Sequence, residues 1–429
     1  MRYKNFPFHI LSAALLLAPL SRAADSHHAV VLRAAKLVDV ETGRVIAPAE
    51  ILVEGERITE AGTTVRHPDG AEVVDLGSST LLPGLIDVHV HLFLHPGLDE
   101  DMQTVRESVP KRTLLAAIAA RDDLMAGFTA ERDMGTEGAG SADTALRDAI
   151  NDGLLPGPRL RVSGNAISTL GGHEDAIHFN PGIHMPSNAD YANNAAELVT
   201  LIRQQHKEGS DFVKIYETGR DEMQDGVLHT PYQYSLEEMK AAVAEAKRLG
   251  SWVAVHDQGE PGALYAAEAG VSSIDHATQL SDETMRLMKE KGIPAVPTFT
   301  VFEHFAADPA SAAHERPMME YKIKEFKRQI AAGVPFAVGS DVGPFPHGTQ
   351  AEELVLMVKY GMKPAEVLKA DYLNGAKLMG MSGQIGELKS GYYADIVAVP
   401  GSPLDDISVV KKVSFVMKGG AIIRRPPPH

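Results

Sequence analysis

Two histidines spaced two residues apart offer the first chemistry in this sequence. His89 and His91 end an apolar run over residues 85–91. If this run is a β-strand, both imidazoles point to the same face and could bind one metal ion. The spacing is also compatible with two ordinary surface histidines, so the pair needs support from elsewhere in the chain.

Four more ionisable residues lie within or directly after short apolar runs. They are Lys214, His256, His276 and Asp341. Lys214 needs an explanation of its own, because burying an unpaired ammonium in an apolar strand is costly. A lysine that is paired, or whose amine reaches solvent, is the ordinary explanation. Six candidate ligands in comparable positions nevertheless favour a shared metal site.

The elements that would position these residues alternate along the chain. Short apolar runs alternate with longer amphipathic stretches, several of which end in a glycine. This pattern predicts an α/β fold in which eight parallel strands and their helices form a (β/α)8 TIM barrel. The carboxyl ends of barrel strands meet at one mouth, where active sites are built. The expected strands are 85–91, 128–133, 159–164, 212–216, 252–256, 273–276, 295–298 and 336–340.

Short β-rich runs precede and follow the barrel region. We expect the barrel over residues 83–384 and a composite small β-sandwich domain from residues 24–82 and 385–429. Residues 1–23 are predicted to be a signal peptide, with positive charge, an apolar run and a small-x-small cleavage site. The run is too short to span a bilayer. We therefore expect a secreted or periplasmic protein without a stable membrane anchor; a buried N-terminal helix is the alternative.

The composition limits both the classes of binding partner and the residue types that could bind a metal ion. The formal net charge is -16, with no local basic patch, so nucleic acid and anionic lipid are not expected partners. The chain has no cysteine, which excludes disulfides and thiolate metal sites. A metal would have to be held by His, Asp, Glu or a modified Lys.

These motifs resemble those of the amidohydrolase superfamily over nearly the whole mature chain. The motifs are the run from Leu82 to His91, Val213-Lys214-Ile215, His256, Asp275-His276 and Gly339-Ser340-Asp341. Within the superfamily, Gly171-Gly172-His173 and the Lys-Ile-Tyr of residues 214–216 are similar to a narrower clade. That clade holds the metal-dependent Xaa-Pro and Xaa-Arg dipeptidases and the ochratoxin-degrading amidohydrolases.

The resemblance implies a binuclear metal centre. Lys214 would carry CO2 as a carbamate that bridges two Zn²⁺ ions, although Mn or Co would also fit. The first ion would be held by His89, His91 and Asp341, and the second by His256 and His276. Asp341 would also act as the catalytic acid and base, passing a proton from the attacking water to the leaving nitrogen. The net positive charge of such a site should favour a substrate that bears a carboxylate.

Three further residues are candidates for substrate binding. Tyr216 is two residues past Lys214 and shares its strand face, so its hydroxyl could donate to a substrate carboxylate or an oxyanion. His173 follows two glycines that permit a close backbone approach, and His347 lies in the loop after Asp341. Tyr216 could instead be a core aromatic, and the two histidines could be ordinary surface residues.

We therefore expect an amide hydrolase that acts on N-acyl amino acids or dipeptides with a free carboxylate, with ochratoxin A as a plausible substrate by resemblance. The alternatives are a deaminase, an imidazolonepropionase-like cyclic amide hydrolase, a lactonase or phosphotriesterase, and a non-catalytic binding protein. A deaminase of this superfamily usually has a Glu three residues after the histidine of strand 5, but Gly259 stands there. Relatives in the clade imply a homo-oligomer, with an octamer as one candidate assembly.

Overall fold

The computed structural model describes residues 29–180 and 182–426. The expected signal peptide over residues 1–23 lies outside the described residues. None of the described helices has the length and apolar character that a transmembrane span requires.

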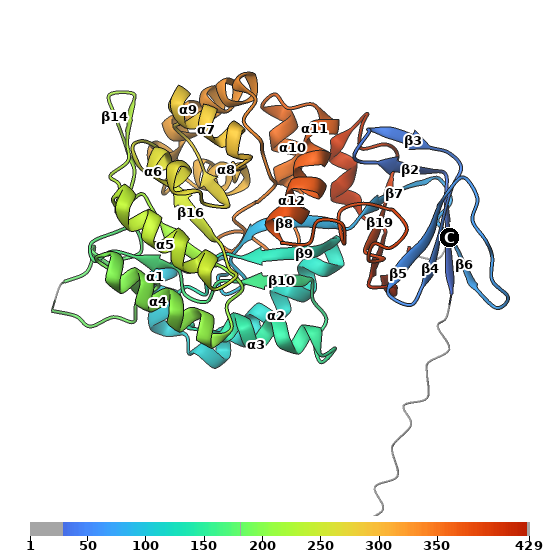
Figure 1. Ribbon diagram of the computed structural model, residues 1–429, viewed down its shortest axis with the longest axis horizontal. Coiled ribbons are helices and arrows are strands. Elements are labelled where there is room, and N and C mark those ends of the chain that lie inside the picture. The colour runs from blue at the N-terminus through green and yellow to red at the C-terminus, as the bar shows by residue number, and fades with distance from the viewer. Residues whose placement is uncertain (1–28, 181, 427–429) are drawn as a thin grey trace, which may run out of the picture.

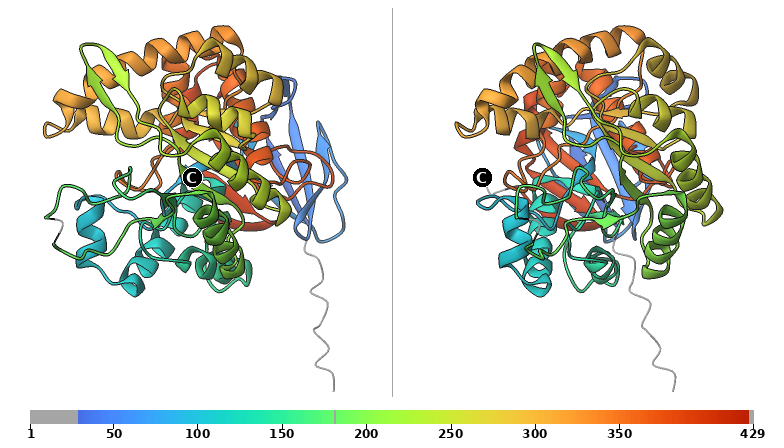
Figure 2. Two further views of the ribbon diagram at one scale, coloured as in Figure 1. Left: turned by 60° about the vertical axis from the view of Figure 1, so that its left-hand side comes forward. Right: turned by 90° about the vertical axis from the view of Figure 1, so that its left-hand side faces the viewer.

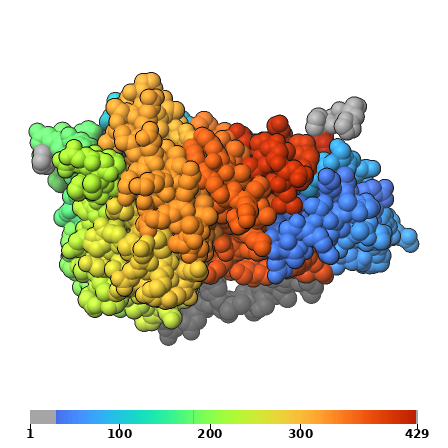
Figure 3. All heavy atoms as spheres, turned by 90° about the horizontal axis from the view of Figure 1, so that it is seen from above, coloured from blue at the N-terminus to red at the C-terminus, as the bar shows by residue number. Residues whose placement is uncertain are grey.

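Two β-sheets stand at one end of the molecule and draw on both ends of the chain (Figures 1 and 3). The first sheet has the order β5 (Arg57–Gly62), β4 (Ala49–Glu54), β1 (Val30–Ala34) and β6 (Glu72–Asp75). The second has the order β21 (Ala421–Arg424), β20 (Phe415–Lys418), β19 (Ile396–Pro400), β7 (Ser79–Pro83), β2 (Lys36–Asp39) and β3 (Arg44–Ile46). Antiparallel pairing of β19 with β7 joins the two chain ends, and one apolar cluster draws on both sheets, including Leu32, Ile396 and Phe415.

Parallel strands and flanking helices make up the rest of the molecule. One sheet has the order β10 (Arg159–Val162), β9 (Phe128–Asp133) and β8 (Leu85–Val90). The other has the order β12 (Asp190–Tyr191), β11 (Ile167–Ser168), β13 (Val213–Tyr216), β16 (Val253–Asp257), β17 (Ser273–His276) and β18 (Ala295–Val296). The N–H of Asp211 donates to the carbonyl of Val162 over 2.8 Å and links the two sheets.

Seven of the eight expected strands are present. The eighth, expected over residues 336–340, does not form a regular strand. Residues 336–342 make only isolated bridges, between Ala295 and Phe336 on one side and between Val90 and Val342 on the other. The Asp87 carboxylate accepts hydrogen bonds from both the N–H and the hydroxyl of Ser340. This backbone N–H therefore bonds to a side chain instead of to a neighbouring strand. Asp341 then adopts a left-handed conformation with φ 62°, which interrupts a regular ladder.

Helices surround these strands (Figure 2). They are α1 (Glu100–Arg106), α2 (Val109–Ala126), α3 (Ala142–Asn151), α4 (Ala195–Glu208), α5 (Leu236–Arg248), α6 (Gly262–Ala269), α7 (Asp282–Lys291), α8 (Phe299–Ala307), α9 (Ala312–Ala332), α10 (Glu352–Lys359), α11 (Pro364–Lys369) and α12 (Gly375–Leu378). Short π and 3-10 segments cover Ala370–Asn374 and η2 (Ile407–Lys412), and β14 (Glu222–Gln224) with β15 (Val227–His229) forms a hairpin. The helix-closing glycines 127, 209, 270, 292 and 333 adopt the predicted left-handed conformation.

Candidate active site

The end of β8 brings His89 and His91 to Asp341. The Asp341 Oδ1 lies 3.5 Å from His89 Nε2 and 3.3 Å from His91 Nε2. The N–H of Asp341 donates to the carbonyl of His89 over 2.8 Å, which anchors the left-handed residue against β8. Burial opposes ionisation of Asp341, but the neighbouring His89 and His91 lower its pKa below the usual range. The three side chains converge closely enough to hold one metal ion.

Two buried carboxylates orient these histidines. His89 Nδ1 lies 2.9 Å from Asp275 Oδ2, and His91 Nδ1 lies 2.9 Å from Glu137 Oε1. A proton on His89 Nδ1 would bond to Asp275 and leave its Nε2 lone pair free, which is the arrangement of a histidine metal ligand. The contact of His91 with Glu137 is an ion pair without a hydrogen bond between these two atoms. Asp275 was predicted to lie beside the site, whereas Glu137 was missed because it belongs to a loop after β9 with no strand register to follow.

His256 and His276 lie next to each other at the ends of β16 and β17. Their ring centroids are 4.3 Å apart, and the His276 ring is 5.0 Å from that of His89. His276 Nδ1 is 2.9 Å from the Thr298 hydroxyl oxygen. Burial is the main cause that lowers the pKa of both imidazoles well below the usual range, so both are neutral near pH 7. Within the described residues, the buried His256 Nε2 has no hydrogen-bond partner.

Lys214 is 1% exposed and lies close enough to both groups to influence the pKa values of His89, His276 and Asp341. Within residues 29–180 and 182–426, its amine has no hydrogen bond or ion pair, and the Tyr216 ring centroid lies 5.1 Å away. Burial lowers the pKa of Lys214, which favours the neutral amine. A neutral amine is the form that reacts with CO2. We call His89, His91, Lys214, His256, His276 and Asp341 the mouth cluster.

Tyr216 and His173 lie beside the mouth cluster. Their rings are stacked with centroids 4.9 Å apart and 14° between planes, and the His173 ring is 4.1 Å from that of His256. Burial raises the pKa of Tyr216 well above the usual range, and nearby Glu137 and Glu174 act in the same direction. The Tyr216 hydroxyl therefore stays protonated and can donate a hydrogen bond.

His347 does not join this group. Its Nδ1 is 2.7 Å from Asp123 Oδ2, and its side chain is 8% exposed. Contact with Asp123 of α2 overcomes the effect of burial and raises the pKa of His347. The structure thus places His347 in a contact between its loop and α2, and a direct contact with substrate stays a prediction without geometric support.

Two buried glutamates and the half-buried Glu100 form a second acidic group near the mouth cluster. Glu100, Glu137 and Glu174 each bring one carboxylate oxygen within 4.8 Å of the others. Two of them, Glu100 and Glu174, line a cavity of about 760 Å³ together with His173 and Arg220. Sequence reasoning passed over these glutamates, although Glu174 directly follows His173. Burial raises the pKa of all three carboxyl groups, which favours their neutral forms.

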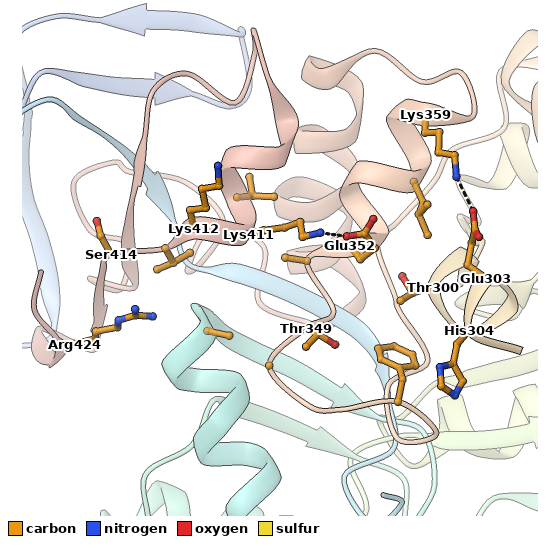
Figure 4. Close-up of a pocket in the computed structure, with 17 residues that line it drawn as sticks. Thr300, Glu303, His304, Thr349, Glu352, Lys359, Lys411, Lys412, Ser414 and Arg424 are labelled. Atoms are coloured by element: carbon orange, nitrogen blue, oxygen red, sulfur yellow. Dashed lines mark hydrogen bonds and ion pairs between the residues drawn. The ribbon is translucent and has the colours of Figure 1, made fainter. Parts of the chain in front are cut away.

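A larger hollow lies elsewhere. A cavity of about 870 Å³ is bordered by α8, α10, η2 and β21 (Figure 4). It contains the ion pairs Lys359–Glu303 and Lys411–Glu352. No residue of the mouth cluster lines it. Size alone therefore does not mark the chemical site in this molecule.

The donor set at the mouth cluster fits metal ions. Neutral imidazoles and a carboxylate are the ligands that Zn²⁺, Mn²⁺ and Co²⁺ accept. Among the described residues, the buried His256 Nε2 has no hydrogen-bond partner, and the Lys214 amine makes no hydrogen bond or ion pair. Bound metal and a modified lysine would supply those partners.

A family model with the description Amidohydrolase family matches residues 80–423. The chain belongs to the amidohydrolase family. The match includes every residue of the mouth cluster, strand β19 and all but the first residue of β7.

Known relatives place this amidohydrolase more narrowly. An ochratoxinase of Aspergillus niger is 32% identical over 377 residues, which cover 81% of this chain and 76% of the relative. A solved Xaa-Pro dipeptidase with methionine bound in its active site is 32% identical, with a TM-score of 0.82 over 92% of this chain and 99% of that chain. An imidazolonepropionase of Geobacillus sp. (strain WCH70) is 27% identical over 349 residues, 76% of each chain.

These findings confirm the dipeptidase-like clade that the motifs predicted. This amidohydrolase has an α/β fold that contains a TIM barrel, and it is an enzyme that hydrolyses amide bonds.

Proposed function

We propose that this amidohydrolase is a binuclear metal-dependent enzyme that cleaves the amide bond of N-acyl amino acids or dipeptides. The observation that carries the proposal is Lys214, a buried lysine near the candidate ligands of both ions. Its amine has no hydrogen bond or ion pair among the described residues. A mononuclear deaminase or a simple binding protein gives no reason to bury this lysine. Carboxylation gives one, because a carbamate offers one oxygen to each of two ions.

The proposed metal ligands divide between two ions. His89, His91 and Asp341 would hold the first, His256 and His276 the second, and carboxylated Lys214 would be shared. Two divalent ions at these positions, with zinc as the default, would supply a water of lowered pKa and polarise the scissile carbonyl.

The protein's own residues would move the proton and fix the geometry. The Asp341 carboxylate is ionised at neutral pH and can take a proton from the attacking water and deliver it to the leaving nitrogen. Glu137 and Asp275 hold the imidazoles of His91 and His89 in place. The protonated Tyr216 hydroxyl can donate to the developing oxyanion.

Substrate recognition would use the cavity beside His173. We propose that Arg220, which lines this cavity, binds the free carboxylate of the leaving amino acid. Its guanidinium is held by His178 at 2.9 Å and by the carbonyl of Asp175 at 3.1 Å. Similarity to the ochratoxinase supports ochratoxin A as one candidate substrate, with cleavage to ochratoxin alpha and phenylalanine. His173 would contact the acyl group.

The domain boundaries form part of the proposal. Residues 83–384 would close into an eight-stranded barrel, supported by the bridges that residues 336–342 make to β18 and β8. Residues 24–82 and 385–429 would form the composite β-sandwich, supported by the pairing of β19 with β7. Export through residues 1–23 and assembly into a homo-oligomer remain proposals from the sequence.

Metal analysis combined with a substrate panel tests this function. Purified enzyme should contain two ions per chain and should hydrolyse dipeptides or N-acyl amino acids that have a free carboxylate. The same compounds with an amidated carboxylate should be poor substrates, mainly through a raised KM, and Arg220→Gln should remove that difference. Fewer than two ions at saturation would contradict the binuclear centre. Hydrolysis restricted to imidazolone rings or lactones would favour the cyclic-substrate alternatives.

A further inference from the structure

The backbone turns in an unusual way where β17 ends. His276 and Ala277 have φ angles of 70° and 45°, a region that residues with a Cβ rarely adopt. His276 is the proposed ligand that this turn carries, so the turn decides where its imidazole points. A conformation of this kind persists only where its surroundings hold it.

Two side chains from α9 hold both carbonyls of this turn. Lys322 Nζ donates to the carbonyl of His276 over 2.5 Å and to the Thr278 hydroxyl over 3.0 Å. Gln329 Nε2 donates to the carbonyl of Ala277 over 2.7 Å. The two residues lie seven positions apart on one helix face, and they are only 2% and 3% exposed.

The contacts of Lys322 continue to the loops after two neighbouring strands. The Thr278 hydroxyl donates to Gln258 Oε1 over 2.5 Å, and the Gln258 N–H donates to the Thr218 hydroxyl over 3.0 Å. Gln258 follows the strand that carries His256, and Thr218 follows the strand that carries Lys214. A single buried amino group on α9 therefore connects the ends of three strands that bear proposed metal ligands.

We propose that Lys322 is a positioning residue for the second metal site, and this inference rests on the proposed binuclear function. Its Nζ faces the rings of Phe302 and Phe299, with centroids 4.4 Å and 5.6 Å away. These faces favour a cation and offer no hydrogen-bond acceptor. The donors of Lys322 are thus directed at the His276 carbonyl and at Thr278, and they fix the turn that aims the imidazole.

Lys322→Met tests the proposal, with Lys324→Met on the exposed side of the same helix as the matched control. Zinc binding is measured by calorimetry on metal-free enzyme in bicarbonate buffer. The wild type and Lys324→Met should bind two ions, whereas Lys322→Met should bind the second at least tenfold more weakly and the first unchanged. If Lys322→Met bound both ions with the same affinities as the wild type, the proposal would be overturned.

Hydrogen exchange of the metal-free enzyme separates this inference from the proposed function. The N–H groups of Ala277 and Gln279 donate to the carbonyls of Asp257 and Gln258, so their exchange reports on the turn. Exchange in residues 276–279 should rise at least tenfold in Lys322→Met and stay unchanged in Lys324→Met. Unchanged exchange would overturn the positioning role, whereas a wild type that binds a single ion would contradict the proposed function instead.

Thr278→Val covers the case in which Lys322→Met does not fold. This variant keeps the volume and removes the hydroxyl that connects Lys322 to Gln258. The second ion should again bind more weakly, and kcat should fall while KM changes little. Wild-type affinity for the second ion in Thr278→Val would refute the connected network.

Discussion

At the scale of single residues, the chemistry depends on the protonation states of the side chains in the mouth cluster. His256 and His276 are kept neutral by burial, Asp341 is kept ionised by the histidines around it, and the amine of Lys214 is driven towards its neutral form. Each state is the one that a metal ligand or a carbamate precursor needs. Burial and neighbouring charges, rather than residue type alone, produce this set of protonation states.

Lys214→Ala should remove most of the activity. Without the amine there is no shared ligand for two ions, so we expect a loss of at least a hundredfold in kcat/KM and fewer than two bound metals. Rates and metal content measured on the same sample test this. Lys207→Ala, on the exposed face of α4, is the control and should behave like the wild type. Full activity in Lys214→Ala would remove the carbamate from the scheme.

Glu137→Gln should weaken the first metal site. The amide keeps the size of the side chain but loses the charge that holds the Nδ1 proton of His91. Partners of this kind usually contribute about 10- to 100-fold in metal affinity, so we expect a decrease in that range. Competition with a coloured chelator measures it. Glu237→Gln, whose side chain is 82% exposed, should leave the affinity unchanged.

At the scale of elements, the site depends on a close approach between residues 336–342 and β8. A Cβ built on Gly339 would lie 2.7 Å from His89 Cβ and 2.5 Å from Val296 Cγ1. Glycine is therefore needed here for space, since its φ angle lies outside the left-handed region. This contact brings Asp341 within reach of the two histidines on β8.

Gly339→Ala should push the two segments apart. Overpacking of this kind costs about 1–3 kcal/mol of folding free energy, and we also expect weaker metal binding because His89 is displaced. Urea unfolding and metal titration provide the two measurements. Gly62→Ala at the end of β5 is the comparison, since its nearest contact would be 3.7 Å from the Thr64 oxygen. A stable Gly339→Ala with normal metal affinity would be incompatible with this contact.

At the scale of the whole molecule, a partly buried ion pair connects β10 to the β-sheets at the end of the molecule. Arg159 of β10 contacts both oxygens of Asp395, at 2.7 Å and 3.1 Å, and its guanidinium lies 3.7 Å from the Tyr393 ring centroid. The N–H of Gly419 donates to the same carboxylate over 2.7 Å. Sequence segments more than 200 residues apart meet at this point.

Arg159→Gln should destabilise the entire chain. It leaves the Asp395 carboxylate, which is 3% exposed, without its charged partner. Breaking a buried pair in this way costs about 3–5 kcal/mol, and the remaining exposure of Arg159 places the expected loss near the lower end. Arg121→Gln removes a surface pair with Asp122 and should change stability by less than about 1 kcal/mol. Equal melting temperatures for the two variants would contradict this role.

Stability should also fall in acid through Glu50. The hydrogen bond with His67 lowers the pKa of Glu50 to about 2, and burial opposes this effect less strongly. Because the folded pKa lies below the unfolded value of 4.5, the stabilisation is complete above about pH 4.5 and is lost as the pH falls towards 2. The stability difference between wild type and Glu50→Gln, measured at pH 7, 5, 4 and 3, should therefore shrink over that interval. A constant difference would rule out this linkage.

The sequence by itself predicted seven of the eight strands, the helix-closing glycines and the six residues that meet in the mouth cluster. This was possible because strand ends in a barrel meet at one mouth, so residues such as His256 and Asp341 can be assigned without knowing any distance. The family followed from the same residues. Parity along the strand also placed Tyr216 correctly beside Lys214.

Only the tertiary structure decided the partners that come from loops and from other helices. Glu137, Glu174 and Lys322 have no register that relates them to β8 or β17, so no pattern in the sequence could place them. His347 shows the converse, since its position after Asp341 suggested the mouth but its loop turns it towards Asp123. Local periodicity fixes which face of a strand a residue occupies, whereas long-range packing fixes what lies opposite that face.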